Sequence, residues 1–145
     1  MTMTPFGPDS TPEQWNARGQ GYFPGYVGLV VTGLGHGFAR GRLDIEQHHL
    51  APNGYLHAAA VLAVADTLAG YGCVQSLPEG ATGFTTIEVK TNYIGTATKG
   101  SVSCEARLAH GGRTTQVWDA EVVDDTTGKV IALFRCTQMI LYPRG

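Results

Sequence analysis

A nearly uninterrupted run of small apolar residues around one carboxylate constrains this fold more than any other feature. Residues 56–76 are mainly alanine, glycine, leucine and valine, contain no proline, and lie between the turn-like Pro52-Asn53-Gly54 and Leu77-Pro78-Glu79-Gly80. This pattern predicts one helix of about twenty residues, roughly 30 Å long. Alanine and glycine occupy almost every face of it, so we expect the rest of the chain to approach it closely and to bury it on most sides.

Asp66 is the one charged residue inside this helix. Removing an unpaired carboxylate from water costs several kcal/mol or raises its pKa, so a site that keeps one usually has a use for it. We therefore take Asp66 as the first candidate for chemistry. The alternative is a structural acid that bonds to Thr67, to Thr86 or to a buried arginine of another chain.

Strand-like alternation surrounds the helix on both sides. A short helix is predicted to begin at Thr11-Pro12-Glu13-Gln14 and to stop near residues 19–21. Strands are predicted at 26–34, 37–45, 85–93, 101–109 and 129–142, with one more between turns at 111–112 and 124–128. In the strand 85–93, odd-numbered residues from Thr85 to Tyr93 should face away from even-numbered residues from Thr86 to Asn92. No strand–helix units alternate, which favours an α+β protein with one antiparallel sheet curled around one helix.

Composition describes an ordinary single domain. The chain has 145 residues, 43% of them hydrophobic, and its 10 basic against 12 acidic residues offer no basic stripe for nucleic acid and no polybasic membrane anchor. The N-terminus has no signal-peptide pattern and no apolar segment is expected to reach membrane-spanning length, which together favour the cytoplasm. Three cysteines that are far apart (Cys73, Cys104 and Cys136) are predicted to be reduced core residues rather than a disulfide framework.

Other chemistries find little support. The histidines His48, His49 and His57 match no zinc spacing, so we expect His48 and His49 to be loop residues in solvent and expect no metal and no cofactor. No Gly-x-Ser-x-Gly elbow is present, and no cysteine has an obvious histidine partner. The glycines within 33–37 lack the helix and acid of a dinucleotide fingerprint.

The segment Gly54-Tyr55-Leu56-His57-Ala58, followed by Asp66, resembles the hotdog-fold acyl-CoA thioesterases, in particular their phenylacetate-degradation-type, 4-hydroxybenzoyl-CoA thioesterase-like branch. Members typically carry Gly-x-x-His-Gly-Gly at the start of the central helix. An acid follows eight residues after the glycine that comes directly after the histidine. Here Ala58 occupies that glycine position and Asp66 follows it by eight. The resemblance implies a hotdog fold, with residues 1–145 as one domain and residues 1–25 as an N-terminal extension that holds a short helix.

The resemblance also implies residue roles. The backbone N–H of Ala58 would polarise the thioester carbonyl, and Asp66 would act as nucleophile or general base. His57 would have an orienting or structural role at the helix start. Thr86 would orient the attacking water, with the neighbouring Thr85 as the alternative if the strand register differs by one.

The resemblance places substrate-binding positions before the helix as well. Relatives often have Asn or Gln seven residues before the glycine, but this chain has Ala51 there. Asn53 is the candidate substitute, next to Gly54, and Thr85 completes the candidate substrate-binding set. Four basic residues could meet the phosphates of coenzyme A, although such residues usually only solubilise a strand face: Lys99, Arg107, Arg113 and Arg135.

Spacing predicts an active site shared between two subunits. Nine residues separate His57 from Asp66, which is about 13 Å along a helix, too far to serve one carbonyl. We therefore expect a homodimer or homotetramer in which one helix start meets the aspartate of another subunit. The expected activity is hydrolysis of an acyl-CoA. The alternatives are an inactive acyl-CoA binding module and a hotdog-fold enoyl-CoA hydratase or dehydratase.

Overall fold

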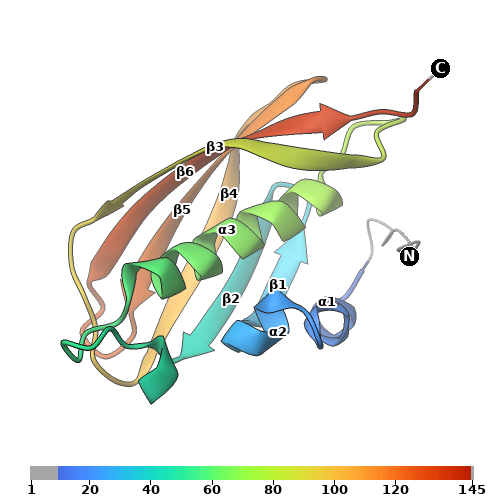
Figure 1. The fold of residues 1–145 in the computed structure, drawn as a ribbon. Coiled ribbons are helices and arrows are strands. Elements are labelled where there is room, and N and C mark those ends of the chain that lie inside the picture. Colours follow the sequence, from blue (N-terminus) through green and yellow to red (C-terminus); the bar gives the residue numbers. More distant parts are fainter. Residues whose placement is uncertain (1–9, 145) are drawn as a thin grey trace.

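The computed structural model describes residues 10–144, in which one long helix, α3, crosses the concave side of a six-stranded antiparallel sheet (Figure 1). The strand order is β1-β2-β4-β5-β6-β3. The helices are α1 (Pro12–Gly19), α2 (Phe23–Val27), the 3-10 helix η1 (Gln47–His49) and α3 (Ala58–Gln75). The strands are β1 (Val30–Gly35), β2 (Phe38–Asp44), β3 (Gly83–Tyr93), β4 (Ser101–Gly111), β5 (Thr115–Asp124) and β6 (Val130–Leu141). The predicted α+β class is confirmed.

The core lies between α3 and the inner face of the sheet. Trp118 on β5 is fully buried and packs directly over Gly72 of α3, where an added Cβ would lie only 2.6 Å from the indole Cη2. The indole Nε1 donates to Gln116 Oε1 at 2.8 Å, and Gln116 Nε2 donates to the carbonyl of Ser76 at 2.9 Å. This close approach of helix and sheet accounts for part of the small-residue content of α3.

Helix α3 has the predicted bounds to within two residues, with His57 as its N-cap and Ser76 as its C-cap. The expectation that it is buried on most sides is wrong for the single chain. The sheet covers one face, and residues on the other, such as Leu62, Ala63 and Asp66, are only half-buried. The alanines of its first turn are largely exposed, which leaves room for another element or another chain.

The expectation that no apolar segment reaches membrane-spanning length is also wrong. The 18 residues of α3 are long and apolar enough by length and composition alone. Half of them are buried inside the fold, against the sheet. The apolar character of α3 is therefore explained by its place in the core.

The N-terminal segment combines a confirmed helix with a wrong strand. Thr11 caps α1 as predicted, because its Oγ1 accepts from the Gln14 N–H at 3.3 Å while Gln14 Oε1 accepts from the Thr11 N–H at 2.8 Å. The predicted strand at 26–34 instead begins with the end of α2, and β1 starts only at Val30. Pro24 in the first turn favours this short helix. Residues 1–9 of the predicted extension lie outside the described residues.

A β-bulge changes the predicted faces of β3. The register to β6 shifts between Thr86, which pairs with Gln138, and Glu88, which pairs with Thr137. The extra residue, Ile87, places Thr86 on the same inner face as Val89 and leaves Thr85 on the outer face. The simple alternation predicted for 85–93 is therefore wrong across the bulge.

His49 corrects the prediction that both loop histidines are in solvent. His48 is exposed, but His49 is 5% exposed, its Nδ1 accepts from the Glu46 N–H at 3.0 Å, and its Nε2 lies 2.6 Å from the carbonyl of Val27. Because Nδ1 is an acceptor, Nε2 carries the proton and donates to Val27. His49 thus links the end of α2 to the segment before α3 through a side-chain hydrogen bond.

The three cysteines are buried and free, as predicted. Burial raises the pKa of the Cys73, Cys104 and Cys136 thiols to about 12. They are therefore protonated core residues at neutral pH and poor nucleophiles.

Candidate active site

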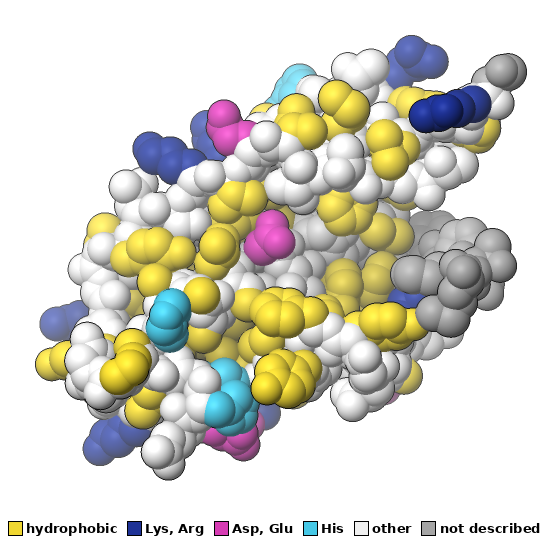
Figure 2. Space-filling view, viewed as in Figure 1, with side chains coloured by type: hydrophobic (Ala, Val, Ile, Leu, Met, Phe, Trp, Pro, Cys, Tyr) yellow, Lys and Arg dark blue, Asp and Glu magenta, His cyan; other side chains and the backbone are white. Residues whose placement is uncertain are grey.

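A cavity of about 840 Å³ lies beside the C-terminal half of α3, between that helix, the start of β3 and α1. This size is typical of a small-molecule site. Figure 2 shows the hollow open on one face of the molecule, bordered mainly by hydrophobic side chains. Residues from three separate parts of the chain line it, among them Trp15, Arg18, Asp66, Thr67, Gly70, Tyr71, Val74, Phe84 and Thr86.

Asp66 lies half-buried in the wall of this cavity, and its Oδ1 is buried without a hydrogen-bond partner among the described residues. Burial raises the pKa of this carboxyl above its usual value. Thr67 and Thr86 line the same cavity, yet between residues 10 and 144 no hydrogen bond joins either to Asp66. Among residues 10–144, the structural-acid alternative therefore lacks the hydrogen-bond partners that it would need.

The start of α3 offers an amide donor. His57 caps the helix, because its Nδ1 accepts from the Ala59 N–H at 2.9 Å, and its carbonyl accepts from the Ala60 N–H at 2.9 Å. The N–H of Ala58 has no acceptor within the part of the chain that the structure describes. An exposed, unpaired amide at the positive end of a helix dipole can hold a developing oxyanion.

The single chain brings Asp66 and Thr86 together, but not Asp66 and the start of α3. Ala58 and His57 do not line the cavity, and the eight residues from Ala58 to Asp66 span about 12 Å of helix. Thr85 does not line the cavity either. It pairs with Met139 of β6, so its side chain shares the outer face of the sheet with that of Met139.

Asn53 and Gly54 lie in the exposed turn that leads into α3. Asn53 Oδ1 accepts from the Tyr55 N–H at 3.1 Å, and the Gly54 N–H donates to the carbonyl of Ala51 at 2.9 Å. Gly54 has a φ of 89°, which favours glycine. These two residues shape the approach to the Ala58 amide and do not contact the Asp66 cavity.

The sequence analysis missed the far wall of the cavity. Trp15 of α1 stacks on Tyr71 of α3 with ring centroids 4.3 Å apart, and Phe84 approaches Gly70. Gly70 follows Asp66 by four residues, so helical periodicity could have placed it near Asp66. Tyr71 follows by five residues, which periodicity places on a different side of the helix. Nothing in the sequence indicates that Trp15 reaches α3.

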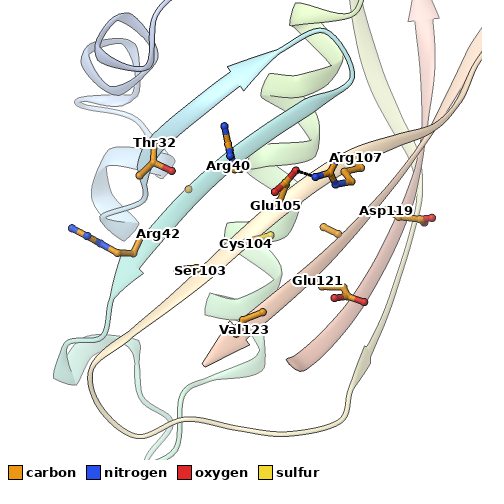
Figure 3. A pocket seen from close by; sticks show the side chains of 12 residues that line it. Thr32, Arg40, Arg42, Ser103, Cys104, Glu105, Arg107, Asp119, Glu121 and Val123 are labelled. Carbon is orange, nitrogen blue, oxygen red and sulfur yellow. Dashed lines mark ion pairs between the residues drawn. The ribbon is translucent and has the colours of Figure 1, made fainter. Parts of the chain in front are cut away.

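A second hollow, of about 690 Å³, lies on the outer face of the sheet and is bordered by charged residues (Figure 3). Arg107 forms an ion pair with Glu105, and next to it Arg135 holds Asp119 through two hydrogen bonds of 2.5 and 2.7 Å. Charge pairing on a solvated face accounts for these arginines. Among the described residues, no three His, Cys, Asp or Glu side chains gather as metal ligands.

The comparison with known proteins identifies the family. The family model described as Thioesterase superfamily matches residues 53–131, which include the start of α3 and Asp66. The chain belongs to the thioesterase superfamily. It is a hydrolase of the thioesterase type, as the sequence resemblance implied.

Relatives and solved structures agree with this assignment. The chain is 28% identical over 134 residues to a 1,4-dihydroxy-2-naphthoyl-CoA hydrolase of Escherichia coli, covering 90% of this chain and 95% of the relative. The hydrolase of the same name from Listeria monocytogenes is 28% identical over 111 residues, 77% of this chain and 89% of the relative.

The fold has close structural neighbours. A thioesterase from Haemophilus influenzae superimposes with a TM-score of 0.85 at 20% identity and 92% coverage of both chains. A mutant thioesterase from Pseudomonas aeruginosa gives a TM-score of 0.85 at 25% identity, covering 92% of this chain and 95% of that one. The predicted hotdog fold is confirmed.

Proposed function

We propose that this protein hydrolyses the thioester of a small or medium acyl- or aryl-CoA, in a site that two copies of the chain complete. The observation that carries the proposal is Asp66, whose buried Oδ1 has no partner among residues 10–144 and which lines a mostly apolar cavity. The relatives named as hydrolases of 1,4-dihydroxy-2-naphthoyl-CoA support a CoA thioester as the substrate class. A cytoplasmic location is part of the same proposal.

The chemistry follows from two groups. The Ala58 N–H donates a hydrogen bond to the thioester oxygen as negative charge develops on it, while the Asp66 carboxylate either removes a proton from the attacking water or attacks the carbonyl carbon itself. The C–S bond then breaks and the coenzyme A thiolate leaves. In the base route, the proton that Asp66 took from water passes to the thiolate or to solvent. In the nucleophilic route, the thiolate is protonated by solvent and a water molecule then hydrolyses the acyl anhydride formed on Asp66, which releases the acid and restores the carboxylate. Burial raises the pKa of the Asp66 carboxyl, which makes its carboxylate both a stronger base and a stronger nucleophile than an ordinary one. Thr86 lies in the same cavity and is the candidate for orienting the water.

The free edge of β3 supports a dimer. This 11-residue strand is the last of the sheet, and within the described residues only β6 pairs with it. Ile87, Val89, Tyr93 and Ile94 are at least 40% exposed along it. A long apolar edge strand readily pairs with another copy. A two-fold contact there would cover the open side of α3 and bring Ala58 of one copy toward Asp66 of the other.

The activity is tested by thiol release from aryl-, short-, medium- and long-chain acyl-CoAs. Asp66→Asn and Asp66→Ala should lower kcat by about 10²–10⁴-fold on the preferred thioester, while folding stays intact by circular dichroism. Asp44→Asn on the exposed end of β2 is the matched control and should keep wild-type turnover. Wild-type rates in both Asp66 variants would refute the assignment.

Complementation tests the shared site. Ala58 is the first helical residue and His57 before it is extended, so Ala58→Pro removes the amide donor from a position that tolerates proline. Both Ala58→Pro and Asp66→Asn should be inactive alone. In an equal, exchanged mixture, half of the dimers are mixed and each contains one intact site, which restores about a quarter of wild-type activity. Absence of any recovery, with exchange verified by mass spectrometry, would contradict the shared site.

The enoyl-CoA hydratase alternative needs a histidine paired with the acid. Within one chain, His57 does not line the Asp66 cavity. In the proposed shared site, the His57 that comes with Ala58 from the other copy already uses its Nδ1 in the helix cap. Loss of the conjugated double bond of an enoyl-CoA without thiol release would be the result that favours it.

A further inference from the structure

Helix α1 builds the far end of the Asp66 cavity. The Trp15 ring is 3% exposed, lies at 29° to the Tyr71 ring with centroids 4.3 Å apart, and its Nε1 lies 3.3 Å from Gln75 Oε1. Arg18, one turn further along α1, lines the same cavity and places its Cζ 5.9 Å from the Trp15 ring centroid. The Tyr71 ring thus stacks on an indole that is itself buried and hydrogen-bonded to α3.

The Tyr71 hydroxyl is not used by the fold. It makes no hydrogen bond within residues 10–144, and it is not one of the buried polar atoms without a partner, so it remains accessible. It lies beside the end of α1, 3.5 Å from the place of a Cβ on Gly19. Burial raises the pKa of Tyr71 and the positive charge of Arg18 lowers it, with burial the larger effect. The phenol is therefore protonated at neutral pH and can donate a hydrogen bond.

Tyr71 and Asp66 line the same cavity from one helix. Tyr71 follows Asp66 by five residues on α3, which corresponds to about 7.5 Å along the helix. Gly70 and Phe84 contribute apolar lining to this cavity, and a Cβ on Gly70 would lie 3.1 Å from Phe84 Cζ. Five residues also turn the helix by about 500°, so the two side chains leave α3 about 140° apart. Both nevertheless line the same cavity of about 840 Å³, which has room for an aromatic acyl group that reaches from Asp66 to the Tyr71 hydroxyl.

We propose that Tyr71 is a specificity-determining residue that donates a hydrogen bond to an oxygen at the end of the acyl group distal to the thioester. Trp15 stacks on the phenol ring and fixes its orientation. The inference rests on the proposed thioesterase function and names the class of acyl group that the same site selects.

Paired substrates test the inference. Benzoyl-CoA and 4-hydroxybenzoyl-CoA differ only in the distal oxygen, and kcat/KM is measured for both with the wild type and Tyr71→Phe. The variant keeps the ring stacked on Trp15, so we expect it to fold. Tyr71→Phe should lower kcat/KM for the hydroxylated thioester by about five- to tenfold and change that for benzoyl-CoA by less than about twofold. Tyr26→Phe, whose residue is 82% exposed on α2, is the matched control.

Each outcome has one meaning. An equal effect of Tyr71→Phe on both thioesters, or no effect on either, overturns the specificity role while leaving the hydrolase assignment intact, provided that Asp66→Asn still abolishes both reactions. Absence of thiol release from every thioester overturns the proposed function, and the specificity role with it. A lower kcat/KM of Tyr71→Phe for 4-hydroxybenzoyl-CoA, with that for benzoyl-CoA nearly unchanged, supports the specificity role of Tyr71.

Discussion

Replacing Gly72 with alanine should destabilise this protein strongly, although alanine is the better helix former. The added Cβ would lie 2.6 Å from Cη2 and 2.7 Å from Cζ3 of Trp118, closer than side chains tolerate. The indole cannot easily withdraw, because it is fully buried and its Nε1 donates to Gln116, which in turn bonds to the end of α3. Overpacking of this kind costs about 3 kcal/mol at the upper end of its range.

The net effect is smaller, because alanine in place of glycine stabilises a helix interior by about 1 kcal/mol. The expected loss is therefore about 2 kcal/mol. With an unfolding entropy of about 0.3 kcal/mol/K for a chain of this length, the Tm should fall by about 7 °C. Differential scanning calorimetry measures this shift directly.

Two further variants make the test specific. At Gly70, the nearest atom to an added Cβ is Phe84 Cζ at 3.1 Å, and that ring borders the cavity and can move into it. Gly70→Ala should thus leave the Tm within about 3 °C of the wild type. Trp118→Phe removes the clashing atoms, so Gly72→Ala should be less harmful in that background. A Gly72→Ala protein that melts at or above the wild-type temperature would refute the packing argument.

Two other predictions concern titration and the buried histidine. Because the folded-state pKa of Asp66 is raised, its contribution to stability is present at low pH and is lost as pH rises through that pKa. Asp66→Asn should therefore have a higher Tm than the wild type at pH 7, and the difference in Tm should close toward pH 4. A difference in Tm that does not depend on pH would count against this argument. His49→Ala removes two hydrogen bonds at a buried position, so it should lower the free energy of unfolding by about 2–4 kcal/mol in urea titrations. His48 is exposed, so His48→Ala should leave the free energy of unfolding nearly unchanged. Equal effects of the two variants would contradict the hydrogen bonds assigned to His49.

Features that depend on neighbouring residues were predictable from the sequence. The capping box at Thr11 and the bounds of α3 follow from local propensity and from the turn residues that flank them. Asp66 stood out because a charge inside an apolar helix is a local anomaly, and the structure leaves its Oδ1 without a partner in the described chain. Residues that are close in the sequence are enough to predict such features.

Features that depend on distant partners were not predictable. The bulge at Ile87 arises from the pairing of β3 with β6, so alternation within the strand alone gave the wrong faces. The burial of His49 depends on a carbonyl 22 residues earlier in the chain, at Val27. Likewise, the stacking of Trp15 on Tyr71 joins segments that no spacing rule connects, and this contact forms the end of the cavity.

The arrangement of the tryptophans has an optical consequence. The sequence contains only two of them, with Trp118 in the core and Trp15 at the cavity wall against Tyr71. In Trp118→Phe the indole emission therefore comes from Trp15 alone. Its fluorescence would then report the arrival of an acyl group at the far end of the cavity in real time, without an attached dye.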